Sequence, residues 1–150
     1  MKNLPFSFAT ATLDDVDQYQ EWAAGQGWQL NSRQLSRGRN LIKYDQLAFP
    51  DLVVGYHHVK QVLHDVFEIP SGHVVFVICR AKLPTVWCGF NIPPTVLAIH
   101  HPVRTYWARH PAGWETYEFC VSEEFIDRTG LFPAKFVDRS IRLVRAFLPL

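Results

Sequence analysis

The sequence is poor in cysteine. Its 150 residues include three, Cys79, Cys88 and Cys120. An odd number at wide spacing argues against a disulfide framework and against a zinc knuckle, which needs closely spaced pairs. We therefore expect reduced, half-buried thiols in a cytoplasmic protein.

Long apolar runs are also lacking. No run of apolar residues approaches the length of a membrane span. The first residues, Met1 to Pro5, contain no apolar segment of the kind found in a secretory signal. The sequence predicts a soluble cytoplasmic protein with no membrane partner.

Excess charge of one sign is a third absence. Fifteen basic and fourteen acidic residues give a formal net charge of +1, so bulk charge does not make the chain a nucleic-acid binder. The charge is uneven, because residues 14–21 are acidic and residues 128–145 are mostly basic. These stretches fit two solvated helix faces. Alternatively, the basic stretch is a helix that leads toward a DNA-binding segment absent from this chain.

Apolar side chains are abundant, at 48% of the residues, with 14% aromatic. That content suits one folded domain with a substantial core. Helical spacing predicts a helix from Leu13 to Gly25 capped by Thr12, and residues 60–69 fit either a helix or a strand. The other regular segments alternate or are apolar throughout, which predicts strands: residues 28–33, 40–49, 52–59, 73–79, 84–89, 95–100, 104–110 and 114–121.

The period becomes helical again after Ser122, which can cap a short helix with acidic residues in its first turn. A last helix is predicted from about Pro133 to about Phe147. We divide the chain into a sensor domain, residues 1–126, and a helical linker, residues 127–150. The last helix carries an apolar stripe with basic residues on its other face, and we predict a dimer interface on this stripe, at Val137, Ile141, Val144 and Leu148.

The order of several short motifs resembles the N-terminal domain of AraC-family transcription regulators. The resemblance covers roughly residues 20 to 126. Each motif alone is weak, and their order and spacing carry the likeness. They are Gly27-Trp28-Gln29-Leu30, Arg33-Gln34-Leu35-Ser36-Arg37-Gly38, Pro70-Ser71-Gly72-His73-Val74-Val75-Phe76, Trp87-Cys88-Gly89, Ile92-Pro93-Pro94, Val96-Leu97-Ala98-Ile99-His100, the turn at Pro102, and Ser122-Glu123-Glu124-Phe125.

The resemblance implies a mostly β (α+β) fold, a cupin-like double-stranded β-helix or jelly-roll barrel with a short N-terminal helix and C-terminal helices. It implies a small-molecule effector bound in the barrel and a homodimer formed through the helices. In that family a second domain with two helix-turn-helix units binds DNA. This chain has no such units, so we expect contact with DNA only through a C-terminal domain absent from it.

Seven histidines invite a second hypothesis, a stand-alone metal-dependent cupin enzyme. Cupin enzymes place two histidines two residues apart on one strand face, followed by a carboxylate, and this sequence has no such pattern. Neighbouring residues of a strand point to opposite faces, so only one of His57 and His58 can enter a barrel. We therefore expect no metal, no cofactor and no catalytic residue.

The effector site is predicted from strand alternation and from the apolar character of ligand pockets. Strand alternation directs almost no cluster of charged side chains inward. This pattern favours a neutral or largely apolar ligand. A barrel filled by its own side chains, serving only protein interaction, is a third alternative. The predicted ligand-binding residues are Tyr56, His58, His73, Phe76, Trp87, His100 and Tyr106.

Overall fold

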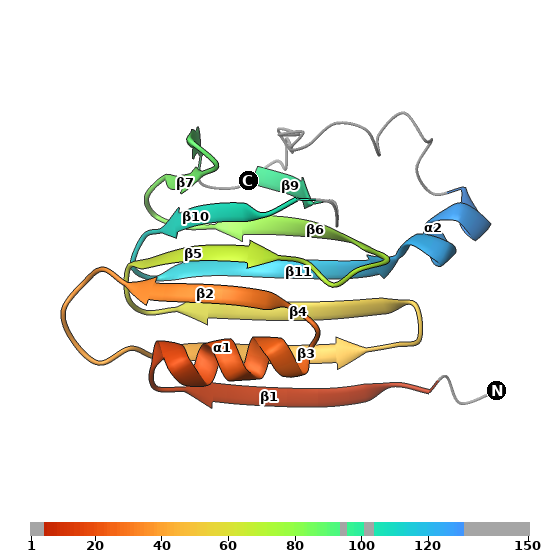
Figure 1. Ribbon diagram of the computed structural model, residues 1–150, viewed down its shortest axis with the longest axis horizontal. Coiled ribbons are helices and arrows are strands. Elements are labelled where there is room, and N and C mark those ends of the chain that lie inside the picture. Colours follow the sequence, from red (N-terminus) through yellow and green to blue (C-terminus); the bar gives the residue numbers. More distant parts are fainter. Residues whose placement is uncertain (1–4, 94–95, 101–103, 131–150) are drawn as a thin grey trace.

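Two antiparallel β-sheets face each other in the computed structural model, which describes residues 5–93, 96–100 and 104–130 (Figure 1). The first sheet has the strand order β1-β3-β4-β11-β6-β9, and the second has the order β2-β5-β10-β7-β8. The strands are β1 (Ser7–Leu13), β2 (Gln29–Gln34), β3 (Ile42–Ala48), β4 (Leu52–Val59), β5 (Leu63–Glu68), β6 (His73–Arg80), β7 (Thr85–Trp87), β8 (Phe90–Ile92), β9 (Val96–His100), β10 (Tyr106–His110) and β11 (Trp114–Ser122).

Alternation along each strand directs one set of side chains into the space between the sheets. Buried and exposed residues alternate along all of β10 and along the first five residues of β3, as in Ile42, Lys43 and Tyr44. The inward set forms one core that joins both sheets, with Val59 and Val75 from the first sheet and Leu63 and Ala108 from the second. The sheets are therefore held together by burial of apolar surface, which is the main stabilising term in such a fold.

Helix α1 (Val16–Gly25) lies beside β2 and in front of β3 in Figure 1. Asp15 caps it, since its side chain accepts a hydrogen bond from the Gln18 amide at 2.8 Å. The predicted cap at Thr12 and start at Leu13 are wrong, because residues 7–13 form β1 along the edge of the first sheet. Tyr19 and Ala23 are buried and direct this helix onto the core.

The ambiguous segment, residues 60–69, is resolved in favour of a strand, because β5 pairs with both β2 and β10. Ser122 caps α2 (Glu123–Thr129) as predicted, and it accepts a hydrogen bond from the Phe125 amide at 3.2 Å. The described chain is thus mostly β, with two short helices. The predicted last helix from about Pro133 lies outside the described residues. Within the described ranges, neither helix is long and apolar enough to cross a membrane.

Candidate functional site

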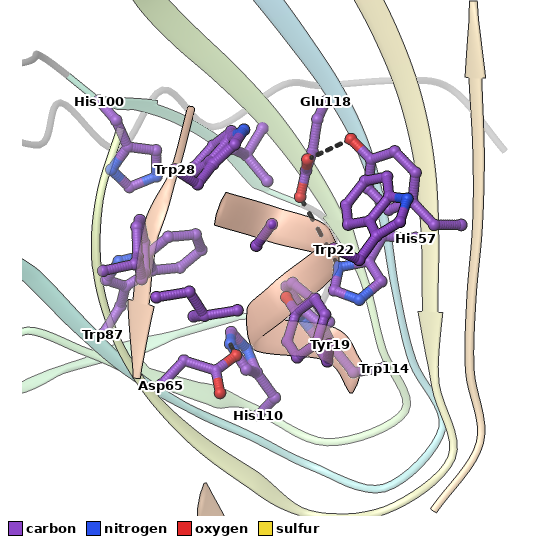
Figure 2. Close-up of a pocket in the computed structure, with 15 residues that line it drawn as sticks. Tyr19, Trp22, Trp28, His57, Asp65, Trp87, His100, His110, Trp114 and Glu118 are labelled. Carbon is purple, nitrogen blue, oxygen red and sulfur yellow. Dashed lines mark hydrogen bonds and ion pairs between the residues drawn. The ribbon is translucent and has the colours of Figure 1, made fainter. Parts of the chain in front are cut away.

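A cavity lies between the two sheets, and α1 runs across it (Figure 2). Its volume is about 50 Å³, room for roughly three to five water-sized groups, since a water needs about 10–15 Å³. Ala23, Leu30 and Val77 supply aliphatic wall. Seven of the fifteen lining residues are tryptophan, tyrosine or phenylalanine, and they come from α1, from the connection to β2 and from both sheets: Tyr19, Trp22, Trp28, Tyr44, Phe67, Trp87 and Trp114.

The aromatic rings hold one another in fixed positions on two sides of the cavity. On one side the Trp87 ring stacks on His100, with the ring centroids 4.6 Å apart and an interplanar angle of 25°. On the other side Trp22 of α1 packs on Tyr44 of β3 with centroids 4.1 Å apart. Trp114 contacts His110 at 3.8 Å between centroids. Such contacts make the wall stiff. Each aromatic ring in it has a partly negative face and a partly positive edge.

Glu118 of β11 is one of two carboxylates in the cavity. The Tyr44 hydroxyl donates to its Oε2 at 3.1 Å, and the Thr116 hydroxyl donates to its Oε1 at 3.4 Å. Nδ1 of His57 lies 3.8 Å from the same Oε1. The cross-strand register explains the grouping, because His57 pairs with Tyr44 on β3 and with Thr116 on β11. Burial raises the pKa of the Tyr44 phenol, and the charge of Glu118 raises it further.

Gly55 makes the contact between Tyr44 and Glu118 possible. A Cβ placed on Gly55 would lie 2.9 Å from Cζ of Tyr44 and closer still to its hydroxyl. The phenol therefore occupies the space that any larger residue would fill. The tyrosine can then cross the face of β4 and reach the carboxylate on β11.

Asp65 of β5 is the second carboxylate. The Ser32 hydroxyl donates to its Oδ1 at 2.6 Å, and Nε2 of His110 lies 3.2 Å from its Oδ2. Ser32 and Asp65 are direct cross-strand partners, while His110 follows Ala108, the partner of Asp65 on β10, by two residues. All three side chains belong to buried residues. Figure 2 shows Asp65 and Glu118 on different sides of the ring of aromatic side chains.

Several buried polar atoms of the lining have no hydrogen-bond partner within the described part of the chain. Among them are Nε2 of His57, Nε1 of Trp87, Nδ1 of His110, and both ring nitrogens of His100. An unpaired buried polar group costs about 1–3 kcal/mol, so native proteins rarely keep several together without a use. The concentration of such atoms around one cavity is typical of a binding site.

Burial lowers the pKa of His100 to about 3, so its imidazole is neutral at physiological pH. An unfolded histidine binds a proton near pH 6.5, so the unfolded state binds one more proton than the folded state between about pH 6.5 and 3. Above pH 6.5 the His100 imidazole is neutral in both states and does not lower the free energy of unfolding. As the pH falls below 6.5, protonation of the unfolded state lowers this free energy. We expect His100 to contribute a fall of about 1.4 kcal/mol per pH unit in this window.

The measurement is urea unfolding of the wild type and of His100→Gln between pH 7 and pH 4. The carboxylates contribute equally to both proteins, so the difference in slope isolates His100. Parallel slopes would contradict a neutral buried imidazole.

A second cavity, of about 80 Å³, adjoins the first and shares Trp28, Tyr44 and Glu118 with it. Exposed Gln26 and partly exposed His73 belong to its rim. It therefore connects the surroundings of Glu118 to the surface of the molecule.

The structure brings two of the predicted ligand-binding residues to the first cavity, Trp87 and His100. Tyr106 lies just behind them, its ring centroid 4.5 Å from that of His100. His73 lines the second cavity instead. These four remain candidates for ligand contact.

The predicted inward direction of Tyr56, His58 and Phe76 is wrong. His57 and Val77 face the cavity, so their neighbours on β4 and β6 point to the outer face of the sheet. Tyr56 packs there on Tyr117, with ring centroids 5.3 Å apart. The predicted dimer residues Val137, Ile141, Val144 and Leu148 lie outside the described residues.

Sequence reasoning missed His57, His110 and both carboxylates. The sequence carried one signal for His57, the apolar Val59 two positions later on the same strand face, which the structure buries fully. Ser32 opposite Asp65 gave no comparable signal. Within residues 5–93, 96–100 and 104–130, no three His, Cys, Asp or Glu side chains group as a metal site would require.

Comparison with known proteins gives no match to a family model, to a curated protein or to a solved structure.

Proposed function

We propose that the chain is the effector-sensing and dimerisation domain of an AraC-type transcription regulator, with a cupin-like jelly-roll barrel as its sensor. A small molecule binds in the cavity between the sheets. Its binding is transmitted to a DNA-binding helix-turn-helix domain that this chain does not contain. A metal-dependent cupin enzyme is the alternative, and a metal bound to the purified protein would favour it.

The observation that carries the proposal is the cavity, with its aromatic walls and its unpartnered polar atoms. Small-molecule sites are concave, mostly apolar and furnished with a few polar groups that orient the ligand. The position of α1 supports a sensing role, because Tyr19, Trp22 and Ala23 of this helix touch the same space as residues of both sheets. A ligand that prefers one position of α1 shifts the population of that position, which is sufficient for regulation.

Tryptophan fluorescence is a direct assay for occupancy. Four of the five tryptophans line the cavity, and the fifth, Trp107, points outward from β10. A screen of small neutral, cationic and anionic compounds is expected to give saturable changes in emission for one class. Light scattering at several concentrations tests the dimer, and a monomer at all of them contradicts that part of the proposal.

Filling the cavity is expected to weaken ligand binding. Ala23 lines it and is buried, whereas Ala24 is exposed on the same helix. Ala23→Leu places three further carbons in a space for few atoms, so the affinity for any compound found in the screen should fall about tenfold or more. Ala24→Leu is the matched control and should bind as the wild type does. If Ala23→Leu keeps its fold, shown by an unchanged circular dichroism spectrum, and also keeps full affinity, the ligand binds elsewhere.

A further inference from the structure

The acidic residues of the described cavity lining are not matched by lysine or arginine. Asp65 and Glu118 both line it, while none of the described lining residues is lysine or arginine. Both carboxylates act on the same buried phenol, because burial and then the charges of Asp65 and Glu118 raise the pKa of Tyr19. The field inside the cavity therefore disfavours an anion and favours a cation.

Aromatic faces add to this preference. The cavity has four tryptophans, two tyrosines and a phenylalanine in its wall. The face of an aromatic ring is negative and attracts a cation placed over it, tryptophan most strongly, and enclosures of such rings recognise methylated ammonium groups. Figure 2 shows Trp22, Trp28, Trp87 and Trp114 distributed around the space rather than stacked on one side of it.

We infer that the cavity binds the methylated ammonium group of a small organic cation, held by the aromatic walls together with Asp65 and Glu118. This inference rests on the proposed function, because it names the class of ligand for the same site. It replaces the neutral or largely apolar ligand that the sequence favoured.

The hydrogen bonds of the carboxylates favour a quaternary ammonium over a primary one. Each carboxylate oxygen already faces a partner: Ser32 and His110 at Asp65, and Tyr44, Thr116 and His57 at Glu118. These carboxylates can therefore attract a cation through their charge, whereas their oxygens are already engaged by other partners. A trimethylated, quaternary ammonium is attracted by charge and by ring faces, and it has no N–H to donate.

Size agrees with this class. A trimethylammonium group has four heavy atoms, and the cavity has room for roughly three to five water-sized groups. The remainder of a larger cation can extend past Trp28 and Glu118 into the second cavity, which reaches exposed Gln26.

The test compares two ligands that differ in charge and hardly in shape. Choline carries a trimethylammonium group, and 3,3-dimethyl-1-butanol carries a neutral carbon in place of its nitrogen. The affinities are measured by calorimetric titration of the whole chain at about pH 8, where ordinary imidazoles are neutral. The Kd for choline should be lower than the Kd for the alcohol by about tenfold or more.

A pair of variants locates the effect. Glu118→Gln keeps the shape of the side chain and removes its charge, so choline should bind more weakly while the neutral alcohol is unaffected. Glu115→Gln is the control, because Glu115 lies on the outer face of the same strand and should leave both affinities unchanged. The comparison of the two ligands on the wild type needs no variant, so it decides the question even where Glu118→Gln fails to fold.

The outcomes separate the inference from the proposed function. Preference for choline that Glu118→Gln reduces supports the inference. Equal binding of choline and the alcohol, or preference unchanged in Glu118→Gln, overturns it. If choline does not bind while a neutral or anionic compound from the screen competes for the cavity, the inference fails and the sensor function stands. If nothing binds, both fail.

Discussion

Trp87→Ala is expected to lower the free energy of unfolding by about 3–5 kcal/mol, because it removes the largest apolar side chain that the second sheet contributes to the core. The Trp87 side chain is 2% exposed and touches rings from both sheets, His100 on the first and Phe67 on the second. Its loss leaves a hole that β7, a strand of three residues, can close only in part. Urea unfolding followed by circular dichroism measures the change.

Trp107→Ala is the matched control on the neighbouring strand β10. Trp107 is 39% exposed and stacks on His64 with ring centroids 6.0 Å apart. Because the Trp107 side chain lies on the outer face of the sheet, its truncation should lower the free energy of unfolding by about 1 kcal/mol or less. Similar losses for the two variants would mean that Trp87 is not packed between the sheets.

Asp65→Ala is the second large effect, with an expected loss of about 3 kcal/mol. It removes the only acceptor that the structure gives to the Ser32 hydroxyl and to Nε2 of His110 within the described chain. Both residues are buried, so neither group regains a partner from solvent. The same urea unfolding experiment, at about pH 7, measures the loss.

Asp14→Ala removes an equally short contact at the surface, where Asp14 pairs with Arg39. The side chain of Asp14 is 43% exposed, against 3% for Asp65. Exposed pairs contribute about 0–1 kcal/mol because water and salt screen them. A loss for Asp65→Ala no larger than for Asp14→Ala would show that water reaches the buried pair.

Alternation and turn residues predicted most of the strands. Residues 52–59 and 73–79 were placed within one residue of β4 and β6, because apolar runs between Pro, Gly and Asp turns admit few other structures. The edge strand β1 was missed. Its side chains are mostly exposed, so no buried face gives it a period. The acidic residues that follow it favoured a helix that began too early.

The site depends on which of two faces each strand turns inward, and one residue of error reverses the answer. That happened on β4, where Leu52, Val54 and Tyr56 look like the apolar face while Gly55 and His57 face the cavity. The inward set carries the polar groups because they pair across strands, Tyr44 with Glu118 for instance. Such pairing depends on strand order, which a single sequence does not reveal. Trp87 and His100 were found because both faces of their segments are largely apolar.

The position of α1 has a kinetic consequence. Within the described chain, α1 and the adjoining Trp28 form the part of the cavity wall that no ladder of strand hydrogen bonds holds, whereas β11 and β5 are bonded on both sides. Segments of this kind open at a lower free energy than central strands, in local excursions that leave the remainder folded. Entry and exit of a ligand would then follow the opening frequency of one ten-residue helix, so residence time and amide exchange in α1 should change together.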